Sequence, residues 1–209
     1  MNVKMMKGIM MMAVAVMLGG CEEKEALQPD PAPQNPPVEQ TGKTLVLVYS
    51  KTGNTMAVAQ NIKQLLDADL LEVEPATPYP DTYNETLPVA TQEIEDIDKR
   101  GIYPEIATTI ESMDDYETVI VCSPIWWSRI ATPMQSFLHT CSGMTDDKRM
   151  TLVVTSGATG IETAWNDLQR LCPNATLLSP GIRISAGASH NALATVSNWL
   201  VSIGLYSEE

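Results

Sequence analysis

The sequence predicts an α/β fold in which a doubly wound parallel sheet lies between two layers of helices. Short apolar segments alternate along the chain with segments whose apolar residues recur at helical spacing. The apolar segments are nearly continuous, as in Val119-Ile120-Val121-Cys122, which is typical of strands that are covered on both faces. A chain of 209 residues has room for one domain of this kind.

The predicted strands and helices follow one another in a regular order. The first strand spans 44–49, and the next segment, 55–67, has Met56, Ala59 and Ile62 at helical spacing. Further strands are expected at 70–73, 119–122, 151–154 and 182–184, and further helices at 131–141, 160–171 and 188–203. Five strands in this arrangement fit the order 2-1-3-4-5, which gives a three-layer α/β/α architecture.

The connection between the second and third strands, 75–113, is long for a compact α/β unit. It contains Tyr79-Pro80-Asp81-Thr82-Tyr83, followed by a segment that is plausibly helical, 85–99. Long connections of this kind are usually functional or packed on themselves.

The segment after the first strand has the composition of a phosphate-binding loop. It consists of Ser50, Lys51, Thr52, Gly53, Asn54 and Thr55 and leads directly into a helix. Gly53 allows the backbone to approach a ligand closely, and the N-terminus of the helix favours an anion. Neutral hydroxyl and amide groups supply further donors, and no metal is required. The spacing of a P-loop is absent. Taken alone, the segment also fits an ordinary turn rich in capping residues.

Two more polar segments directly follow predicted strands. One is Ser123-Pro124-Ile125-Trp126-Trp127, after the third strand, and the other is Ser156-Gly157-Ala158-Thr159-Gly160, after the fourth. In doubly wound sheets, ligands bind beyond the carboxyl ends of the strands, where the strand order reverses. The three segments are therefore expected to meet at one site.

These three segments, in this order, resemble the flavodoxin family over about residues 44–204. The resemblance implies FMN as cofactor, with its phosphate held by residues 50–55 and its ring held by the other two segments. It implies that Trp126 or Trp127 contacts the ring, and that Tyr79 or Tyr83 borders it, although surface packing explains these tyrosines equally well. Gly157 and Gly160 would allow close approach to the pyrimidine side, with Ser156 and Thr159 as donors. The chain departs from the family's usual residues at Ser128-Arg129 and at Ala158.

The first 42 residues are expected to lie outside the folded domain, which we place at 43–209. Residues 1–20 have the pattern of an export signal, because an apolar run too short to span a bilayer follows Lys4 and Lys7. Leu18-Gly19-Gly20-Cys21 resembles the cleavage site of bacterial lipoproteins, which implies a lipidated Cys21 and a location in the cell envelope, on the periplasmic or the surface side. Residues 21–42 are acidic and rich in proline, as in an extended tether. The alternative is a secreted soluble protein.

Charge and cysteine content narrow the classes of function. The net charge of −13 makes nucleic acid an unfavourable partner and is compatible with docking to basic redox proteins, or simply with solubility. Cys122, Cys141 and Cys172 have no C-x-x-C spacing, so neither a metal site nor a redox dithiol is indicated, while a bridge between Cys141 and Cys172 stays open. His139 and His190 are expected on helix surfaces or at helix caps.

Three functions follow from these observations. The leading one is an electron carrier that binds FMN and is anchored to a membrane by lipid. The second is a reductase that uses NADH or NADPH to reduce quinones or other small acceptors. The third is a binding module without a cofactor on the same fold, motivated by the two departures from the family's pattern. The sequence does not identify the redox partner.

Overall fold

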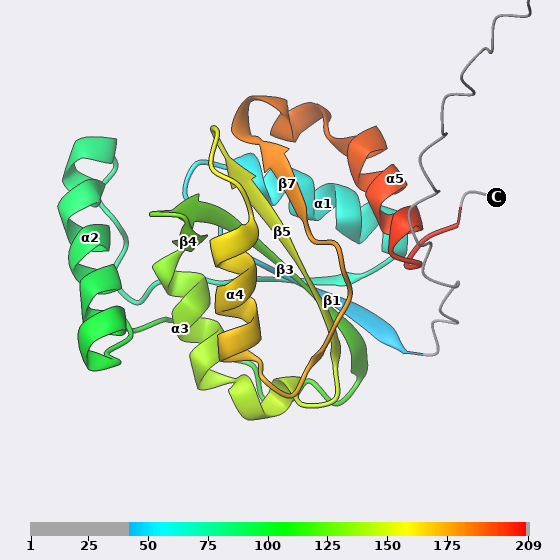
Figure 1. Cartoon of the computed structure of the whole chain (residues 1–209), viewed down its shortest axis with the longest axis horizontal. Helices are drawn as coiled ribbons and strands as arrows, with labels where there is room; N and C mark the ends of the chain where they lie inside the picture. The colour runs from blue at the N-terminus through cyan, green and yellow to red at the C-terminus, as the bar shows by residue number, and fades with distance from the viewer. Residues whose placement is uncertain (1–41, 208–209) are drawn as a thin grey trace, which may run out of the picture. The chain divides into compact units, whose positions relative to one another are not determined.

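A seven-stranded sheet runs through residues 42–207, the part of the chain that the computed structural model describes. The predicted signal segment, Cys21 and almost all of the predicted tether lie outside these residues. The strands are β1 (Lys43–Val48), β2 (Asp69–Glu72), β3 (Tyr116–Trp126), β4 (Arg129–Ile130), β5 (Arg149–Ser156), β6 (Thr176–Leu177) and β7 (Ile182–Ser185) (Figure 1). The helices are α1 (Asn54–Leu66), α2 (Tyr83–Arg100), α3 (Thr132–Thr140), α4 (Glu162–Leu171) and α5 (Leu193–Ser202), with short 3₁₀ segments at Ser142–Thr145 and Ala186–Asn191.

The predicted parallel order is confirmed, with the fifth position shared by two short strands. The sheet has the order β2-β1-β3-β5-β6, and β7 also pairs with β5. β6 pairs with the start of β5 and β7 with its end, and both pairings are parallel. Pro180 lies between them and cannot donate to a strand ladder, which accounts for the interruption. The seventh strand, β4, forms a short antiparallel hairpin with β3.

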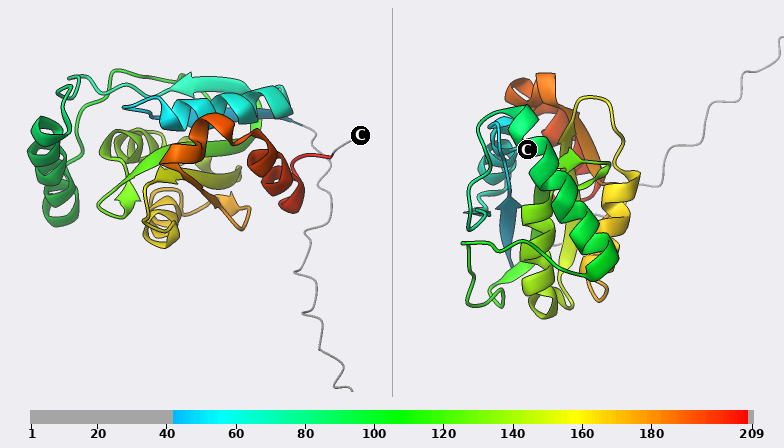
Figure 2. Two further views of the ribbon diagram at one scale, coloured as in Figure 1. Left: turned by 90° about the horizontal axis from the view of Figure 1, so that it is seen from above. Right: turned by 90° about the vertical axis from the view of Figure 1, so that its left-hand side faces the viewer.

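Each central strand contributes alternate residues to two apolar cores. Leu45 and Leu47 of β1 pack in the core beneath α3 and α4, which includes Phe137 and Leu168. The residues between them in β1, such as Val46, pack in the opposite core, which α1 and α5 cover with Ile62 and Leu200 (Figure 2). Covering both faces explains why the sequence of these strands is almost continuously apolar.

The helix predicted in the long connection forms as α2, which lies beyond the carboxyl ends of the central strands, apart from the two helical layers (Figures 1 and 2). Its N-cap is Thr82, whose hydroxyl accepts from the backbone N–H of Glu85 and donates to the Glu85 carboxylate, and it ends at Gly101, which has a φ of 64°. Segment 105–108 returns along β2, where the backbone N–H of Ala107 donates to the carbonyl of Glu74 at 2.8 Å. The long connection is thus packed on itself, as expected.

Within residues 42–207, no helix combines the length and the hydropathy that a membrane-spanning segment needs. The helix predicted at 188–203 is divided, because a 3₁₀ segment precedes α5 and the two meet at Ala192.

The three cysteines of the described domain are free and buried, so the bridge between Cys141 and Cys172 that the sequence left open is not formed. Burial raises the pKa of Cys141 to about 12 and that of Cys172 to about 11. Burial also raises the pKa of Cys122. All three side chains are therefore neutral thiols near pH 8, and thiols are much weaker nucleophiles than thiolates.

We expect these three cysteines to resist alkylation by iodoacetamide in the native protein at pH 8 and to react fully in guanidinium chloride. Mass spectrometry of tryptic peptides measures both states. Rapid native labelling of Cys141 or Cys172 would contradict the packing described here.

Candidate functional site

The segment between β1 and α1 presents several unsatisfied donors at one point. Gly53 precedes α1 with a φ of 83°, a left-handed conformation that favours glycine, and no side chain caps the helix. The first N–H groups of α1 are therefore free to bind an anion. The hydroxyl of Ser50 is buried and has no hydrogen-bond partner among the described residues. A buried polar group without a partner is uncommon and points to a missing ligand.

A hydroxyl pair joins this first segment to the end of β5. The Oγ1 atoms of Thr55 and Thr155 are 2.7 Å apart, and both side chains are buried. In such a pair one hydroxyl donates to the other, so one of the two retains a hydrogen for a further acceptor. The side chain of Asn54 is held on two sides, because it donates to Thr52 Oγ1 at 3.3 Å and accepts from Ser189 at 3.0 Å.

Lys51 connects the first segment to the polypeptide that leads into α2. Its Nζ atom donates to the carbonyl oxygens of Pro80, at 2.8 Å, and Asp81, at 3.4 Å. The sequence predicted Lys51 only as a member of the loop. The structure gives it a second role as a link between two walls of the same pocket.

The segment after the predicted third strand is mostly strand rather than loop. β3 continues to Trp126 and turns back at once into β4, with Trp126 paired to Arg129. The two turn residues, Trp127 and Ser128, have φ values of 49° and 66°. A two-residue hairpin with both central residues left-handed matches the twist of its strands, but each non-glycine residue costs about 1 kcal/mol in this conformation. The surrounding structure must hold this turn in place.

Ser123 stabilises this hairpin and does not line the pocket described below. Its buried hydroxyl accepts from the backbone N–H of Ala131 at 3.1 Å and donates to the carbonyl of Pro124 at 2.9 Å. The residues that follow it in β3, from Pro124 to Trp126, do face the pocket.

A pocket of about 420 Å³ opens beside the first segment, a volume within the usual range for small-molecule sites. Its walls come from the first segment, the β3–β4 hairpin and the N-terminal half of α2. The lining residues are Lys51, Thr52, Asp81, Tyr83, Thr86, Leu87, Ala90, Pro124, Ile125, Trp126 and Trp127. Two aromatic side chains lie exposed at its edge, with 43 % of Trp127 and 75 % of Tyr83 accessible to solvent.

An aromatic cluster lies behind Trp126. Its ring meets those of Tyr49 and Tyr79 edge to face, with centroids 5.6 and 5.1 Å away. The hydroxyl of Tyr79 donates to Glu93 Oε2 of α2 at 2.5 Å. Burial raises the pKa of both tyrosines, which therefore remain neutral phenols at physiological pH. Sequence reasoning missed Tyr49 and Glu93, and it had placed Tyr79 as a candidate at the ring's border, whereas only Tyr83 lines the pocket.

The segment after β5 is closed by its own hydrogen bond, in which Ser156 Oγ donates to the carbonyl of Thr159 at 2.6 Å. A Cβ atom at Gly157 would meet nothing within 4 Å, and one at Gly160 would meet the carboxylate of Glu162. Neither glycine has a positive φ. Of the five predicted residues 156–160, none lines the pocket, and the hydroxyl pair with Thr55 comes from Thr155 of β5, the residue before this segment.

The histidines lie outside the pocket, as the sequence predicted. His139 is exposed in the last turn of α3 and stacks on Tyr103 with ring centroids 4.0 Å apart, while His190 is exposed in the second 3₁₀ segment. Among residues 42–207, no cluster of histidine, cysteine and acidic side chains has the arrangement of a metal site.

A parallel sheet with uncapped helix donors and an aromatic pocket at its carboxyl edge has the architecture of doubly wound α/β proteins, in which ligands bind beyond the carboxyl ends of the strands. The sequence profile of the flavodoxin family matches residues 43–202, and the chain belongs to this family. No curated protein matches the sequence significantly.

The solved structures that resemble the chain include three bacterial proteins. One, from Bacteroides uniformis and provisionally named a flavoprotein, is 26 % identical with a TM-score of 0.64, over 76 % of this chain and 97 % of its own. A similarly named protein from Bacteroides eggerthii is 24 % identical with a TM-score of 0.60, over 74 % and 98 %. A flavoprotein from Lactobacillus acidophilus, solved in complex with FMN, is 21 % identical with a TM-score of 0.57, over 73 % and 99 %.

Proposed function

We propose that the folded domain binds FMN and that the protein carries electrons. The observation that carries this proposal is the buried hydroxyl of Ser50, which lacks a partner beside the uncapped N-terminus of α1. Membership of the flavodoxin family and the FMN complex of the Lactobacillus acidophilus flavoprotein support the same ligand.

The residues present fit the two halves of FMN. The phosphate would be held by Ser50, by the first N–H groups of α1 and by the hydroxyls of Thr52 and Thr55. The flat ring would lie in the pocket against Trp126, Trp127 and Tyr83, because aromatic side chains favour contact with such a surface. When bound, the flavin supplies the electron chemistry, whereas the protein supplies binding, orientation and electrostatics.

The overall charge of the protein favours a low reduction potential for a bound flavin. The chain carries a net charge of −13, whereas the pocket lining holds one acidic and one basic side chain, Asp81 and Lys51. The net negative charge disfavours the addition of a further negative charge to a bound ring. The neutral phenols of Tyr49 and Tyr79 add no compensating charge behind Trp126.

Transient kinetics separate a carrier from a reductase. The purified protein, loaded with FMN, is mixed with NADH or NADPH in a stopped-flow instrument, and the loss of flavin absorbance is followed. A carrier bleaches slowly with either nucleotide and rapidly with a reduced redox protein. Fast, saturable bleaching by a nicotinamide nucleotide would instead assign the reductase function.

The envelope location belongs to the same proposal, and its support is the sequence Leu18-Gly19-Gly20-Cys21. In a bacterial host, the full chain would fractionate with membranes and carry acyl chains on Cys21. A Cys21→Ala variant would lose the lipid, which intact-mass measurement would detect. Equal membrane association of both proteins would contradict the anchor.

We expect Thr55→Ala and Thr52→Ala each to weaken FMN binding by about 1–3 kcal/mol, because each substitution removes a hydroxyl donor to the phosphate. Fluorescence titration measures both dissociation constants. Thr140→Ala is the matched control, since this threonine lies at the end of α3 and bonds only to the carbonyl of Ser136. Unchanged FMN affinity in both variants would contradict the proposal that residues 50–55 bind the phosphate.

A further inference from the structure

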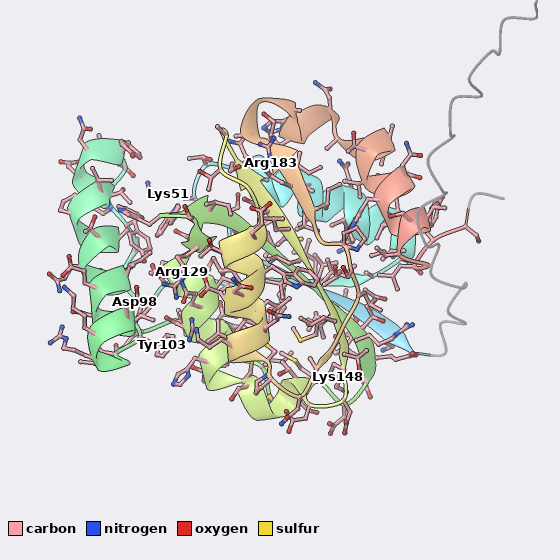
Figure 3. The ribbon with its side chains drawn as sticks, in the orientation of Figure 1. Lys51, Asp98, Tyr103, Arg129, Lys148 and Arg183 are labelled. Atoms are coloured by element: carbon pink, nitrogen blue, oxygen red, sulfur yellow. The ribbon has the colours of Figure 1, made fainter. Side chains whose placement is uncertain are left out.

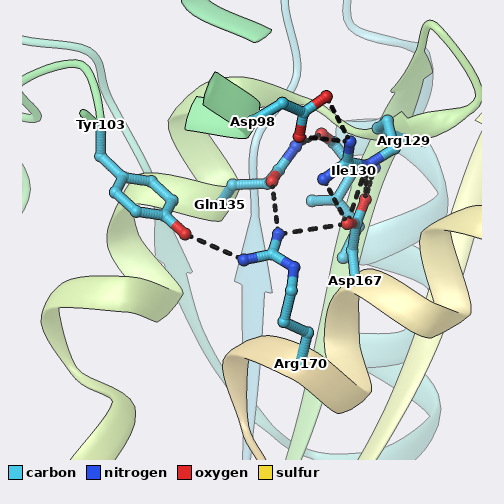
Figure 4. Close-up of polar contacts among 7 residues, drawn as sticks. All are labelled: Asp98, Tyr103, Arg129, Ile130, Gln135, Asp167 and Arg170. Carbon is cyan, nitrogen blue, oxygen red and sulfur yellow. Dashed lines mark hydrogen bonds and ion pairs between the residues drawn. The ribbon is translucent and has the colours of Figure 1, made fainter. Parts of the chain in front are cut away.

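Arg129 links three elements that are far apart in the sequence. It is the first residue of β4, and its Nε atom donates to both carboxylate oxygens of Asp167 in α4, at 2.8 and 2.7 Å. Its Nη1 atom donates to both carboxylate oxygens of Asp98 in α2, at 2.8 and 3.0 Å. Figure 3 places Arg129 between the body of the domain and α2, and Figure 4 shows the contacts.

The end of this network at Asp167 is firmly anchored. Only 4 % of the Asp167 side chain is exposed, and the carboxylate also accepts from the backbone N–H of Ile130 at 3.2 Å and from Arg170 at 3.2 Å. The side chain of Asp98, by contrast, is 46 % exposed. Arg129 is thus fixed to α4 and reaches outward to α2.

The residue before Arg129 is the second of the two strained residues of the hairpin. Trp127 and Ser128 both have positive φ values, and Trp127 lines the pocket. Strained backbone persists where the surrounding structure fixes it, and such strain gathers at functional sites. The bidentate pair with Asp167, together with the Ile130 N–H bond, fixes the chain directly after this turn.

The opposite wall of the pocket, α2, has little apolar anchorage. Three of its 18 residues are buried, namely Thr86, Ala90 and Ile97. Much of its attachment is polar, through Asp98 to Arg129 and through Glu93 to Tyr79 and Thr132. A segment with few buried apolar contacts opens locally at low free-energy cost. The polar contacts of α2 therefore set the free energy needed to detach this helix from the rest of the domain.

We propose that Arg129 is a positioning residue that holds both the Trp127–Ser128 turn and α2 in place as opposing walls of the flavin pocket. The assignment of the ligand rests on the proposed function, whereas the fastening of α2 does not. Because one guanidinium contacts both Asp167 and Asp98, it fixes the position of α2 relative to the Trp127–Ser128 turn.

The variant Asp98→Asn tests the fastening of α2, because it removes the charge and one of the two acceptors from the contact with Arg129 and leaves the buried pair with Asp167 intact. Asp98 is half exposed, so the domain retains its fold. Glu95→Gln is the matched control, since Glu95 lies on the same helix and pairs only with Lys99, at 2.8 Å, within α2.

In FMN-free protein, hydrogen exchange of the α2 amides should be about threefold to tenfold faster in Asp98→Asn than in the wild type and unchanged in Glu95→Gln. In loaded protein, the rate of FMN release, followed by stopped-flow fluorescence, should rise by a similar factor in Asp98→Asn alone. Identical exchange of the α2 amides in the wild type, Asp98→Asn and Glu95→Gln would contradict the proposal that Arg129 holds α2 in place.

Faster exchange with unchanged FMN release would overturn the role of α2 as a wall of the flavin pocket. A wild-type protein that binds no FMN would overturn the proposed function and with it the assignment of the ligand. The exchange measurement would still decide whether Arg129 holds α2, so the two failures are distinguishable.

Discussion

Replacing Asp167 with asparagine is expected to lower the free energy of unfolding by about 3–5 kcal/mol. The carboxylate is almost fully buried and pairs with Arg129 and Arg170. Its hydrogen bonds also raise the pKa of Arg129, which therefore stays charged at physiological pH. Removing the negative charge leaves a partly buried guanidinium without its main partner, and this is costly.

Urea denaturation of FMN-free protein measures this effect separately from ligand binding. Asp146→Asn is the control, because Asp146 is exposed and its carboxylate accepts a hydrogen bond from Asn174, at 3.2 Å. That substitution should change stability by no more than about 0.5 kcal/mol. A loss below about 1 kcal/mol for Asp167→Asn would mean that the network contributes little to the fold.

Replacing Trp126 with alanine is expected to reduce both stability and affinity for FMN. The ring packs edge to face against Tyr49 and Tyr79 and also lines the pocket. Loss of a large aromatic side chain from such packing costs about 3 kcal/mol of stability. Loss of ring stacking costs about 1–3 kcal/mol of binding, which is roughly 5- to 150-fold in the dissociation constant.

Trp127→Ala is the paired variant that separates the two effects. Trp127 lines the same pocket but is 43 % exposed. It should weaken FMN binding while changing the urea midpoint little. Equal destabilisation by both variants, with no effect on FMN affinity, would show that the tryptophans serve packing alone.

The central strands β1, β3 and β5 could be predicted because each carries its own signal, a nearly continuous apolar run. The β3–β4 hairpin had no such signal. Its turn is Trp127-Ser128, whereas two-residue hairpins of this conformation usually contain asparagine and glycine. Glycine would adopt the left-handed conformation at Ser128 without strain, so the serine carries a conformational cost at this position.

The site could be predicted where its residues are adjacent in the chain, as in the segment from Ser50 to Thr55. It could not be predicted where partners are distant. Arg129 lies 31 residues from Asp98 and 38 from Asp167, and no local pattern links them. Likewise, no local pattern links Thr55 to its hydroxyl partner Thr155 in β5, which is 100 residues away.

The most direct test of a flavin site is a titration of the purified, FMN-free protein with FMN, followed by tryptophan emission. We expect saturable quenching with one equivalent bound, because Trp126 and Trp127 line the pocket. Riboflavin, which lacks the phosphate, should bind more weakly, because it cannot use Ser50 and the N-terminus of α1. Emission that falls only in proportion to added FMN, without saturation, would contradict the account.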